Sequence, residues 1–188
     1  MCGILKSMGG FYIDADLLAH QVMEYGQPAY TEIADIFGNV ILSPEGNIDR
    51  KKLGDIVFRD LGKRKILEQI VHSKVILEFG RLTEKAQTQS GYIFIIWDAP
   101  LLAEAGMHVK CGMVLLVTAS YSTKLSRIML RDGITEERAK LRLHNQPSDD
   151  ELYSRLIAGI GANRVKIIDN NESLQKLDYK TRMAVRGY

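Results

Sequence analysis

The sequence predicts an α/β protein with a parallel sheet that helices cover. Four short apolar runs have the character of strands, at residues 11–14, 92–98, 112–119 and 165–169. None of these runs alternates strictly between apolar and polar residues, which is typical of strands covered on both faces. Helical patterns separate the runs, and strands separated by helices indicate a parallel sheet.

Length and composition indicate one globular domain, or one core with an insertion. The chain has 188 residues, of which 46% are hydrophobic and 26% are charged, and its net charge of +2 favours neither an acidic nor a basic partner. Cys2 and Cys111 form no C-x-x-C pair, so nothing indicates a disulfide framework or a zinc site. The apolar runs are too short to cross a bilayer, and no signal-like segment opens the sequence. A reducing cytoplasm is therefore the default location. We also expect neither a membrane nor a nucleic-acid partner.

The first predicted strand follows a helical run at residues 3–8 and ends in two carboxylates. Asp14 and Asp16 are two residues apart, a spacing that places them on the same side of an extended chain. Ligands of open α/β sheets bind where strands end, and two acids there can serve as a general base and an orienting group. Alternatively, both residues could cap a helix that begins near Leu17.

Between the first and second strands, the sequence predicts more helices than a simple crossover needs. The helical patterns cover residues 28–37, 50–58, 63–72 and about 74–86, and Asp49 is the expected cap of the second of them. We expect a helical insertion beside the carboxyl edge of the sheet. His72 ends one of these helices, where a lone histidine is more often structural than functional.

The second predicted strand also ends in an acid. Asp98 is followed by Pro100, which fixes a turn and cannot continue the ladder. Asp98 could simply cap the next helix, but two acidic strand ends at one sheet edge favour a ligand site.

Two further helices follow the third strand. Ser122 or Thr123 is expected to cap a helix at residues 124–132, and Thr135 opens a second helix that stops before Pro147. Arg127 and Arg131 lie four residues apart in the first of them and therefore share a face. They could form an ordinary solvated surface, or the guanidinium pair that a phosphoryl-transfer lid needs.

The fourth predicted strand ends in Asp169, Asn170 and Asn171, with Ser173 as the cap of a last helix. Turn chemistry alone explains these residues.

Taken in order, these motifs resemble those of the dephospho-CoA kinases, over a span from about residue 2 to residue 177. Each motif alone is weak evidence for the family, whereas the whole set in this order is highly specific to it. The matching positions are residues 13–16 with Ala19 and His20, Gly38, residues 48–53 with Val57 and Phe58, His72, residues 98–102 with Glu104, Arg127, residues 131–133, Gln146 and residues 168–171.

The resemblance implies a P-loop kinase of the nucleoside-monophosphate kinase type, with a three-layer parallel sheet and helices on both faces. It implies a nucleotide-binding core at residues 1–16, 90–121 and 151–188, a helical acceptor domain at residues 17–89 and a lid at residues 122–150. The reaction would transfer the γ-phosphoryl group of ATP to the 3′-hydroxyl of dephospho-coenzyme A, with Mg²⁺, in the last step of coenzyme A synthesis.

The resemblance also implies roles for single residues. Asp16 would be the base or orienting group for the ribose hydroxyl, and Arg127 would stabilise charge from the lid side. Arg131 and Asn170 would contact the nucleotide. The residues implied for the acceptor are Asp14, His72, Asp98, Pro100 and Leu101. No residue of the chain is assigned to a metal.

The chain departs from the family pattern in three places. The glycine-rich phosphate-binding loop, which in the family directly precedes the first helix, is not found in the 188 residues, so we expect the first, central strand to be missing. Residue 73 is Ser instead of the usual Pro, and Asn163 and Glu172 replace the usual Asp and Gly. Two alternatives stay open: another small-molecule P-loop kinase, or a binding protein that keeps the acceptor pocket without catalysing transfer.

Overall fold

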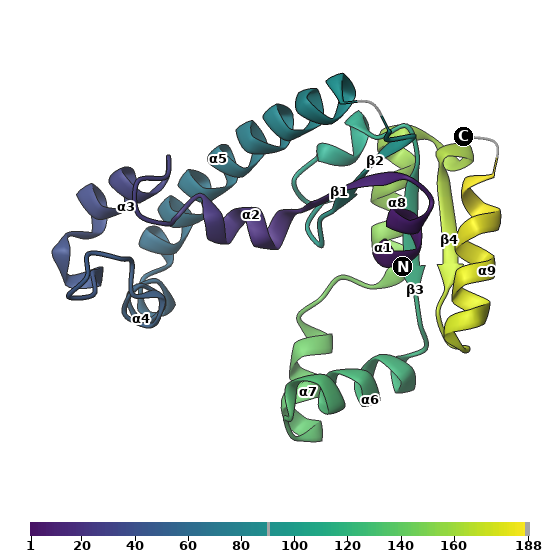
Figure 1. Cartoon of the computed structure of the whole chain (residues 1–188). Helices are drawn as coiled ribbons and strands as arrows, with labels where there is room; N and C mark the ends of the chain where they lie inside the picture. The colour runs from purple at the N-terminus through teal and green to yellow at the C-terminus, as the bar shows by residue number, and fades with distance from the viewer. Residues whose placement is uncertain (90, 187–188) are drawn as a thin grey trace. The chain divides into compact units, whose positions relative to one another are not determined.

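The structure is a computed structural model that describes residues 1–89 and 91–186 (Figure 1). It confirms an α/β fold with parallel strands. The chain forms two compact units: the first unit is Lys6–Ala99 with Cys2, and the second unit runs from Pro100 onward and includes Met1 and residues 3–5. The residues of helix α1 (Cys2–Ser7) are divided between them. The first two strands lie in the same unit as the helical insertion.

The first unit contains one pair of parallel strands. Strand β1 (Gly10–Asp14) pairs with β2 (Phe94–Asp98) in a register that runs from Gly10 opposite Phe94 to Asp14 opposite Asp98. A Cβ at Gly10 would overlap the side chain of Ile96, so the close approach of these strands requires glycine there. The register brings the two acidic strand ends to the same edge.

Helices make up the rest of the first unit. They are α2 (Ala15–Gln21), α3 (Tyr30–Phe37), α4 (Arg50–Arg59) and α5 (Leu61–Thr88), with the short 3₁₀ turn η1 (Asn39–Ile41) after α3. Figure 1 shows α2 and α4 alongside α5, the longest helix. The predicted cap Asp49 is confirmed, because its side chain accepts hydrogen bonds from the backbone N–H groups of Lys51 and Lys52.

Helix α5 is fixed to β2 by aromatic packing. The ring of Phe79, which is almost fully buried, meets that of Trp97 edge-on at a centroid distance of 5.2 Å. The indole N–H of Trp97 donates to the hydroxyl of Thr83 at 3.3 Å. These contacts connect the helical part of the first unit to its sheet.

The prediction of two helices at residues 63–72 and 74–86 is wrong, because α5 is continuous. Ser73 lies at the expected break, but it is compatible with a helix, and its hydroxyl donates to the carbonyl of Ile70 at 2.8 Å. His72 therefore lies within a long helix instead of at the end of one.

The second unit also contains one pair of parallel strands. Strand β3 (Val114–Thr118) pairs with β4 (Val165–Asp169), and helices α8 (Asp149–Ile160) and α9 (Leu174–Val185) pack against them. Two 3₁₀ turns, η2 (Met107–Lys110) and η3 (Ala162–Arg164), complete the layer. One buried hydrophobic cluster of this unit consists of Val114, Leu116, Leu156, Ile160 and Val165.

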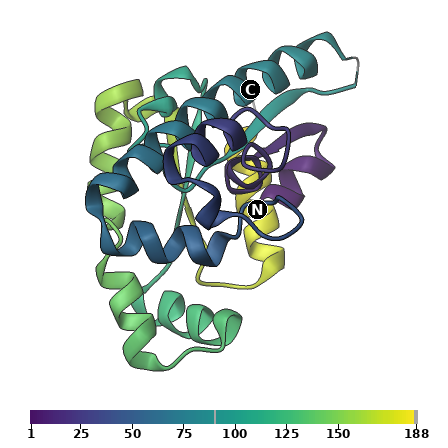
Figure 2. The ribbon, with the colours of Figure 1, turned by 90° about the vertical axis from the view of Figure 1, so that its left-hand side faces the viewer.

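Helices α6 (Tyr121–Asp132) and α7 (Glu136–His144) pack on each other and extend away from β3 and β4 (Figure 2). The expected cap at Ser122 or Thr123 is wrong by two or three residues, because Ser120 caps α6 by accepting from the N–H of Thr123. Thr135 and Ser173 cap α7 and α9 as predicted. Helix α8, which opens with a capping box at Ser148 and Glu151, is a helix that the sequence patterns did not predict.

The single sheet that the sequence predicts is not observed within residues 1–89 and 91–186. Strand β1 pairs only with β2, and β3 only with β4, so the described strands form two two-stranded sheets.

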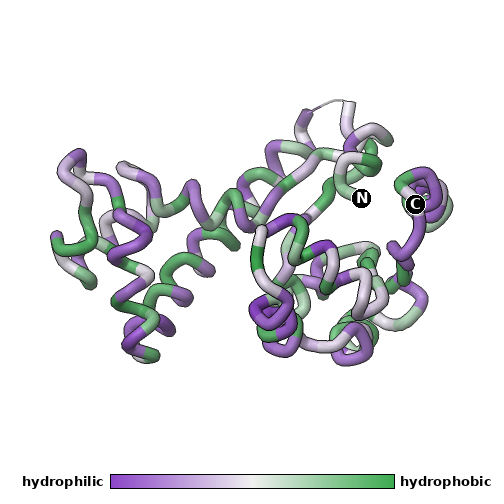
Figure 3. Tube along the Cα trace, turned by 90° about the horizontal axis from the view of Figure 1, so that it is seen from below, coloured by the Kyte–Doolittle hydropathy of each residue, from purple (hydrophilic) through white to green (hydrophobic). Residues whose placement is uncertain are grey.

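Hydrophobic and hydrophilic residues are mixed along the helices, as Figure 3 shows. Among the described residues, no helix has both the length and the apolar character that a membrane span requires.

Candidate active site

Two acidic strand ends meet in the first unit, as the sequence predicts. Asp14 and Asp98 are register partners at the ends of β1 and β2. The hydroxyl of Tyr12 lies between their carboxylates, 2.8 Å from Oδ2 of Asp98 and 3.0 Å from Oδ2 of Asp14. The thiol of Cys2 donates to the same Oδ2 atom of Asp98 at 3.2 Å. The site therefore consists of two carboxylates joined by one phenol, with a thiol that donates to the same Asp98 oxygen as the phenol.

Tyr12 reaches both acids because of strand geometry. Side chains two residues apart on a strand point to the same face, so Tyr12 and Asp14 share one side of β1. The ammonium group of Lys6 lies over the Tyr12 ring, 5.1 Å from its centroid, at a distance typical of a cation–π contact. The ring is therefore held on one face while its hydroxyl points toward the carboxylates.

The site holds its two donors in their neutral form. Burial, reinforced by hydrogen bonds to Asp98 and Asp14, raises the pKa of Tyr12 well above its ordinary value. Burial and the hydrogen bond to Asp98 raise the pKa of the Cys2 thiol to about 11. Both groups therefore remain protonated donors at neutral pH.

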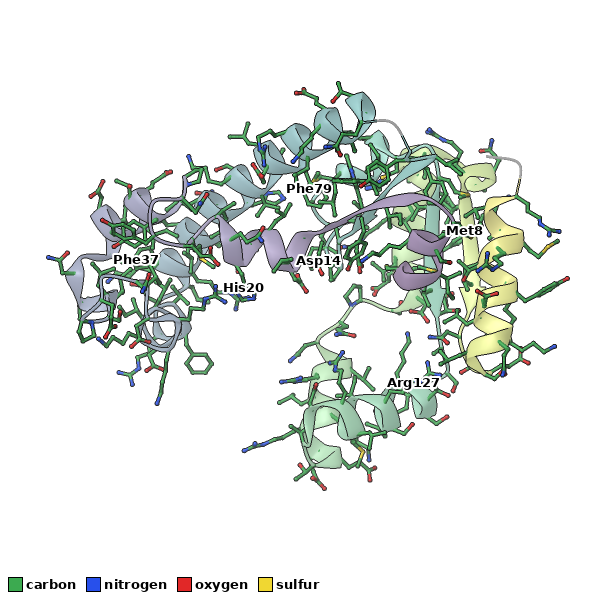
Figure 4. All side chains as sticks on the ribbon, in the orientation of Figure 1. Met8, Asp14, His20, Phe37, Phe79 and Arg127 are labelled. Carbon is green, nitrogen blue, oxygen red and sulfur yellow. The ribbon has the colours of Figure 1, made fainter. Side chains whose placement is uncertain are left out.

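The capping alternative is confirmed for Asp14. Its Oδ1 atom accepts from the N–H of Leu17 at 2.9 Å and so caps α2 at the junction with β1 (Figure 4). The expectation that Asp14 and Asp16 share one side of an extended chain is wrong, because the strand ends at Asp14 and α2 begins at Ala15. Asp16 is exposed in the first turn of α2.

The capping alternative is not observed for Asp98. The segment after β2 forms turns up to Gly106 instead of a helix, and the hydrogen bonds of Asp98 come from Tyr12 and Cys2. Pro100 and Leu101 lie in these turns with exposed side chains. His72 is likewise exposed on α5.

The two arginines expected on one helix face are both on α6 and both exposed, and Figure 4 marks Arg127. Their surroundings differ. Among the described residues, Arg127 forms no ion pair, whereas Arg131 donates from Nε and Nη2 to the Asp132 carboxylate at 2.7 and 3.0 Å. Asp132 also pairs with Arg142, which joins α6 to α7. Arg127 is thus the arginine whose guanidinium is available to an anionic ligand.

Asn170 has a structural contact in the second unit. Its backbone N–H donates to the carbonyl of Thr118 at 2.8 Å, which extends the β3–β4 ladder by one bond. Beside it, the ammonium of Lys180 on α9 reaches Oδ2 of Asp169 at 3.0 Å and Glu172 at 2.8 Å. The hydrogen bond from Lys180 lowers the pKa of Asp169. Turn and ion-pair chemistry therefore accounts for this strand end.

The described residues contain no group of three or more His, Cys, Asp or Glu side chains arranged to hold a metal ion. Asp14 and Asp98 nevertheless supply hard carboxylate oxygens at one edge. Mg²⁺ is commonly held by one or two carboxylates together with phosphates and water. The donor set therefore fits an ion that arrives with a phosphate ligand.

Sequence reasoning did not identify Tyr12 and Cys2 as part of this site. Tyr12 belongs to an apolar run and was counted as a buried strand residue. The signal that could have identified it is the spacing of two between Tyr12 and Asp14, which places a hydroxyl on the face of the acid. No sequence signal connects Cys2 to Asp98, because the two are far apart in the chain.

A family model described as dephospho-CoA kinase matches residues 1–176. The chain is 36% identical over 176 residues to a dephospho-CoA kinase from Thermobifida fusca, covering 93% of this chain and 82% of that protein. It is 37% identical over 172 residues to one from Bacillus licheniformis, covering 92% and 81%.

Two solved structures are similar to the whole chain. The crystal structure of TT1252 from Thermus thermophilus superposes with a TM-score of 0.76 at 25% identity, covering 100% of this chain and 90% of that one. The dephospho-CoA kinase from Campylobacter jejuni gives a TM-score of 0.62 at 28% identity, covering 98% and 88%.

Proposed function

Because this chain belongs to the dephospho-CoA kinase family, we propose that it transfers the γ-phosphoryl group of ATP to the 3′-hydroxyl of dephospho-coenzyme A. The family match over residues 1–176 is the observation that carries this proposal. The meeting of Asp14 and Asp98 at one sheet edge supports it, because ligands of open α/β sheets bind at that position.

In the proposed reaction, the 3′-oxygen forms a bond to the γ-phosphorus as the bond from that phosphorus to the β–γ bridging oxygen breaks. ADP leaves, and the hydroxyl proton passes to a carboxylate. We assign that proton to Asp16, whose exposed side chain lies in the first turn of α2, where a substrate hydroxyl can reach it. Such a base typically contributes about 10²–10⁴-fold to the rate.

Arg127 is assigned to the charge that develops on the transferring phosphoryl group. Its exposed guanidinium, which has no ion pair within the described residues, supports this role. Arg131 and Asn170 are assigned to the nucleotide. For Arg131, this assignment requires that the guanidinium bind a nucleotide phosphate either in addition to the Asp132 carboxylate or in its place.

The acceptor is assigned to the carboxylates of Asp14 and Asp98, to the exposed His72, and to Pro100 and Leu101. We retain the proposed division into a nucleotide core, an acceptor domain at residues 17–89 and a lid at residues 122–150. Mg²⁺ is proposed to enter with ATP and to neutralise phosphate charge. The proposed location is the cytoplasm, and the proposal includes no nucleic-acid partner.

We further propose that the phosphate-binding loop and its strand lie outside residues 1–188. One observation supports this: the 188 residues contain no G-x-x-x-x-G-K-[ST] motif. Translating the reading frame upstream of Met1 tests the proposal. A frame without a glycine-rich loop contradicts it.

The function is tested with purified protein that includes the segment encoded in frame upstream of Met1. This protein, in which all variants below are made, is incubated with ATP, Mg²⁺ and dephospho-coenzyme A, and ADP and coenzyme A are quantified chromatographically. We expect the two products in equal amounts. Adenosine and AMP serve as alternative acceptors, and faster phosphorylation of either one would indicate a different small-molecule kinase. Tight binding of dephospho-coenzyme A without product would indicate a binding protein.

A further inference from the structure

The two strand-end carboxylates, Asp14 and Asp98, differ in how many of their oxygens accept hydrogen bonds. Both oxygens of Asp14 accept hydrogen bonds, Oδ1 from the Leu17 N–H and Oδ2 from the Tyr12 hydroxyl. Asp98 receives both of its donors on Oδ2, from Tyr12 and from Cys2. Within the described part of the chain, Oδ1 of Asp98 therefore has no hydrogen-bond donor.

The Tyr12 hydroxyl carries one proton, so it can donate fully to only one acid at a time. Its contact with Asp98 is shorter, at 2.8 Å against 3.0 Å for Asp14. Asp14 is also held independently by the cap of α2. Removal of the phenolic hydroxyl would therefore affect the orientation of Asp98 more than that of Asp14.

We propose that Tyr12 is a positioning residue that fixes the Asp98 carboxylate, so that its free Oδ1 atom accepts a hydroxyl of the acceptor substrate. The inference rests on the proposed function and adds to it a residue that touches no substrate. The Lys6 ammonium over the ring and the strand register hold the phenol in place. The Cys2 thiol is a weaker second donor on the same oxygen.

The variant Tyr12→Phe keeps the ring and its contact with Lys6 but removes the hydroxyl. Steady-state kinetics are measured with ATP and dephospho-coenzyme A varied in turn. We expect the KM for dephospho-coenzyme A to rise about tenfold, which is the lower range for loss of a hydrogen bond to a charged group, with kcat and the KM for ATP nearly unchanged. Tyr92→Phe is the matched control, because Tyr92 is exposed and its described contact is a ring contact with Phe11.

A double-mutant cycle shows whether Tyr12 acts through Asp98. If it does, Tyr12→Phe combined with Asp98→Asn raises the acceptor KM no further than Asp98→Asn alone. Additive effects overturn the inference. An unchanged KM for dephospho-coenzyme A in Tyr12→Phe also overturns the inference. A loss of both kcat and thermal stability, with neither KM changed, overturns it as well, because Tyr12 would then have only a structural role.

The failure of the inference can be distinguished from failure of the proposed function. Calorimetry of dephospho-coenzyme A binding to the parent protein and to Tyr12→Phe provides a measurement that does not depend on transfer. If the parent and Tyr12→Phe bind dephospho-coenzyme A equally tightly, only the inference is overturned. A parent that neither binds dephospho-coenzyme A nor phosphorylates it overturns both.

Discussion

Gly159 on α8 lies directly against the imidazole of His108 in η2. An added Cβ at residue 159 would overlap Nε2 of His108 and lie 2.7 Å from its Cδ2 atom. His108 is buried, and its Nδ1 atom has no hydrogen-bond partner in the described structure. The absence of a side chain at residue 159 is thus what allows the histidine ring to fit between η2 and α8.

We expect Gly159→Ala to destabilise the second unit by about 1–3 kcal/mol, the usual range for overpacking a closed site. Denaturant unfolding measures the change. His108→Ala in the same chain should recover much of the loss, because it removes the atoms that the new methyl group overlaps. Gly80→Ala is the control: it lies in α5 with nothing near its Cβ position, so it should stabilise by roughly 0.4–1 kcal/mol. Equal effects at both glycines would contradict the packing argument.

Asp16→Asn should lower kcat by about 10²–10⁴-fold, with a much smaller change in the KM for dephospho-coenzyme A, because the amide cannot take the hydroxyl proton. The matched control is Glu84→Gln, a carboxylate-to-amide change at an exposed position of α5. If turnover stays within about threefold of the parent, Asp16 is not the general base, and Asp14 or Asp98 becomes the candidate for that role.

Arg127→Lys keeps the charge but loses the planar fork that matches phosphate oxygens. We expect phosphoryl transfer to fall about 10-fold or more while the midpoint of thermal unfolding stays the same, because the side chain is exposed. Arg155→Lys, an equally exposed arginine on α8, provides the comparison. Full activity of Arg127→Lys would make Arg127 an ordinary solvated charge.

The Cys2 thiol should make stability depend on pH in the alkaline range. Its folded pKa is raised from 9.0 to about 11, so its contribution to stability is fully present below pH 9.0 and is lost as the pH rises toward 11. Two proteins are compared: Cys111→Ala, and the double variant Cys111→Ala with Cys2→Ala. The first should have the larger free energy of unfolding below pH 9.0, and the difference between the two should decrease as the pH rises toward 11. Urea titrations at several pH values measure both free energies. A constant difference would show that the thiol titrates alike in the folded and unfolded states.

The strands and several caps could be predicted from sequence because their signals are local. The apolar run at residues 165–169 became β4 with the same bounds, and Asp49, Thr135 and Ser173 cap helices as expected. Helix α8 was missed although its signals are local: Ser148 and Glu151 form a capping box, and Leu152, Leu156 and Ile160 recur at a spacing of four. The division of α5 failed because the apolar pattern weakens around Ser73 while the backbone remains helical.

For the site, the meeting of Asp14 and Asp98 followed from a general rule about parallel strand ends, and the structure confirms it. The bridge through Tyr12 depends on strand register and side-chain length, and the Asp132 link between Arg131 and Arg142 depends on how α6 packs on α7. These relationships are set by tertiary packing, so no local pattern reports them. The catalytic roles of Asp16 and Arg127 remain predictions.

The continuity of α5 restricts how this helix can change in length. Its buried residues Ile70, Val75 and Phe79 must all face the core, and each residue turns the helix by about 100° and lengthens it by about 1.5 Å. One inserted residue would therefore rotate one end of α5 away from its partners while the other end stays docked on β2. An insertion of about seven residues, close to two full turns, nearly restores the phase. Insertions and deletions in α5 should thus be tolerated only in steps that match its helical repeat.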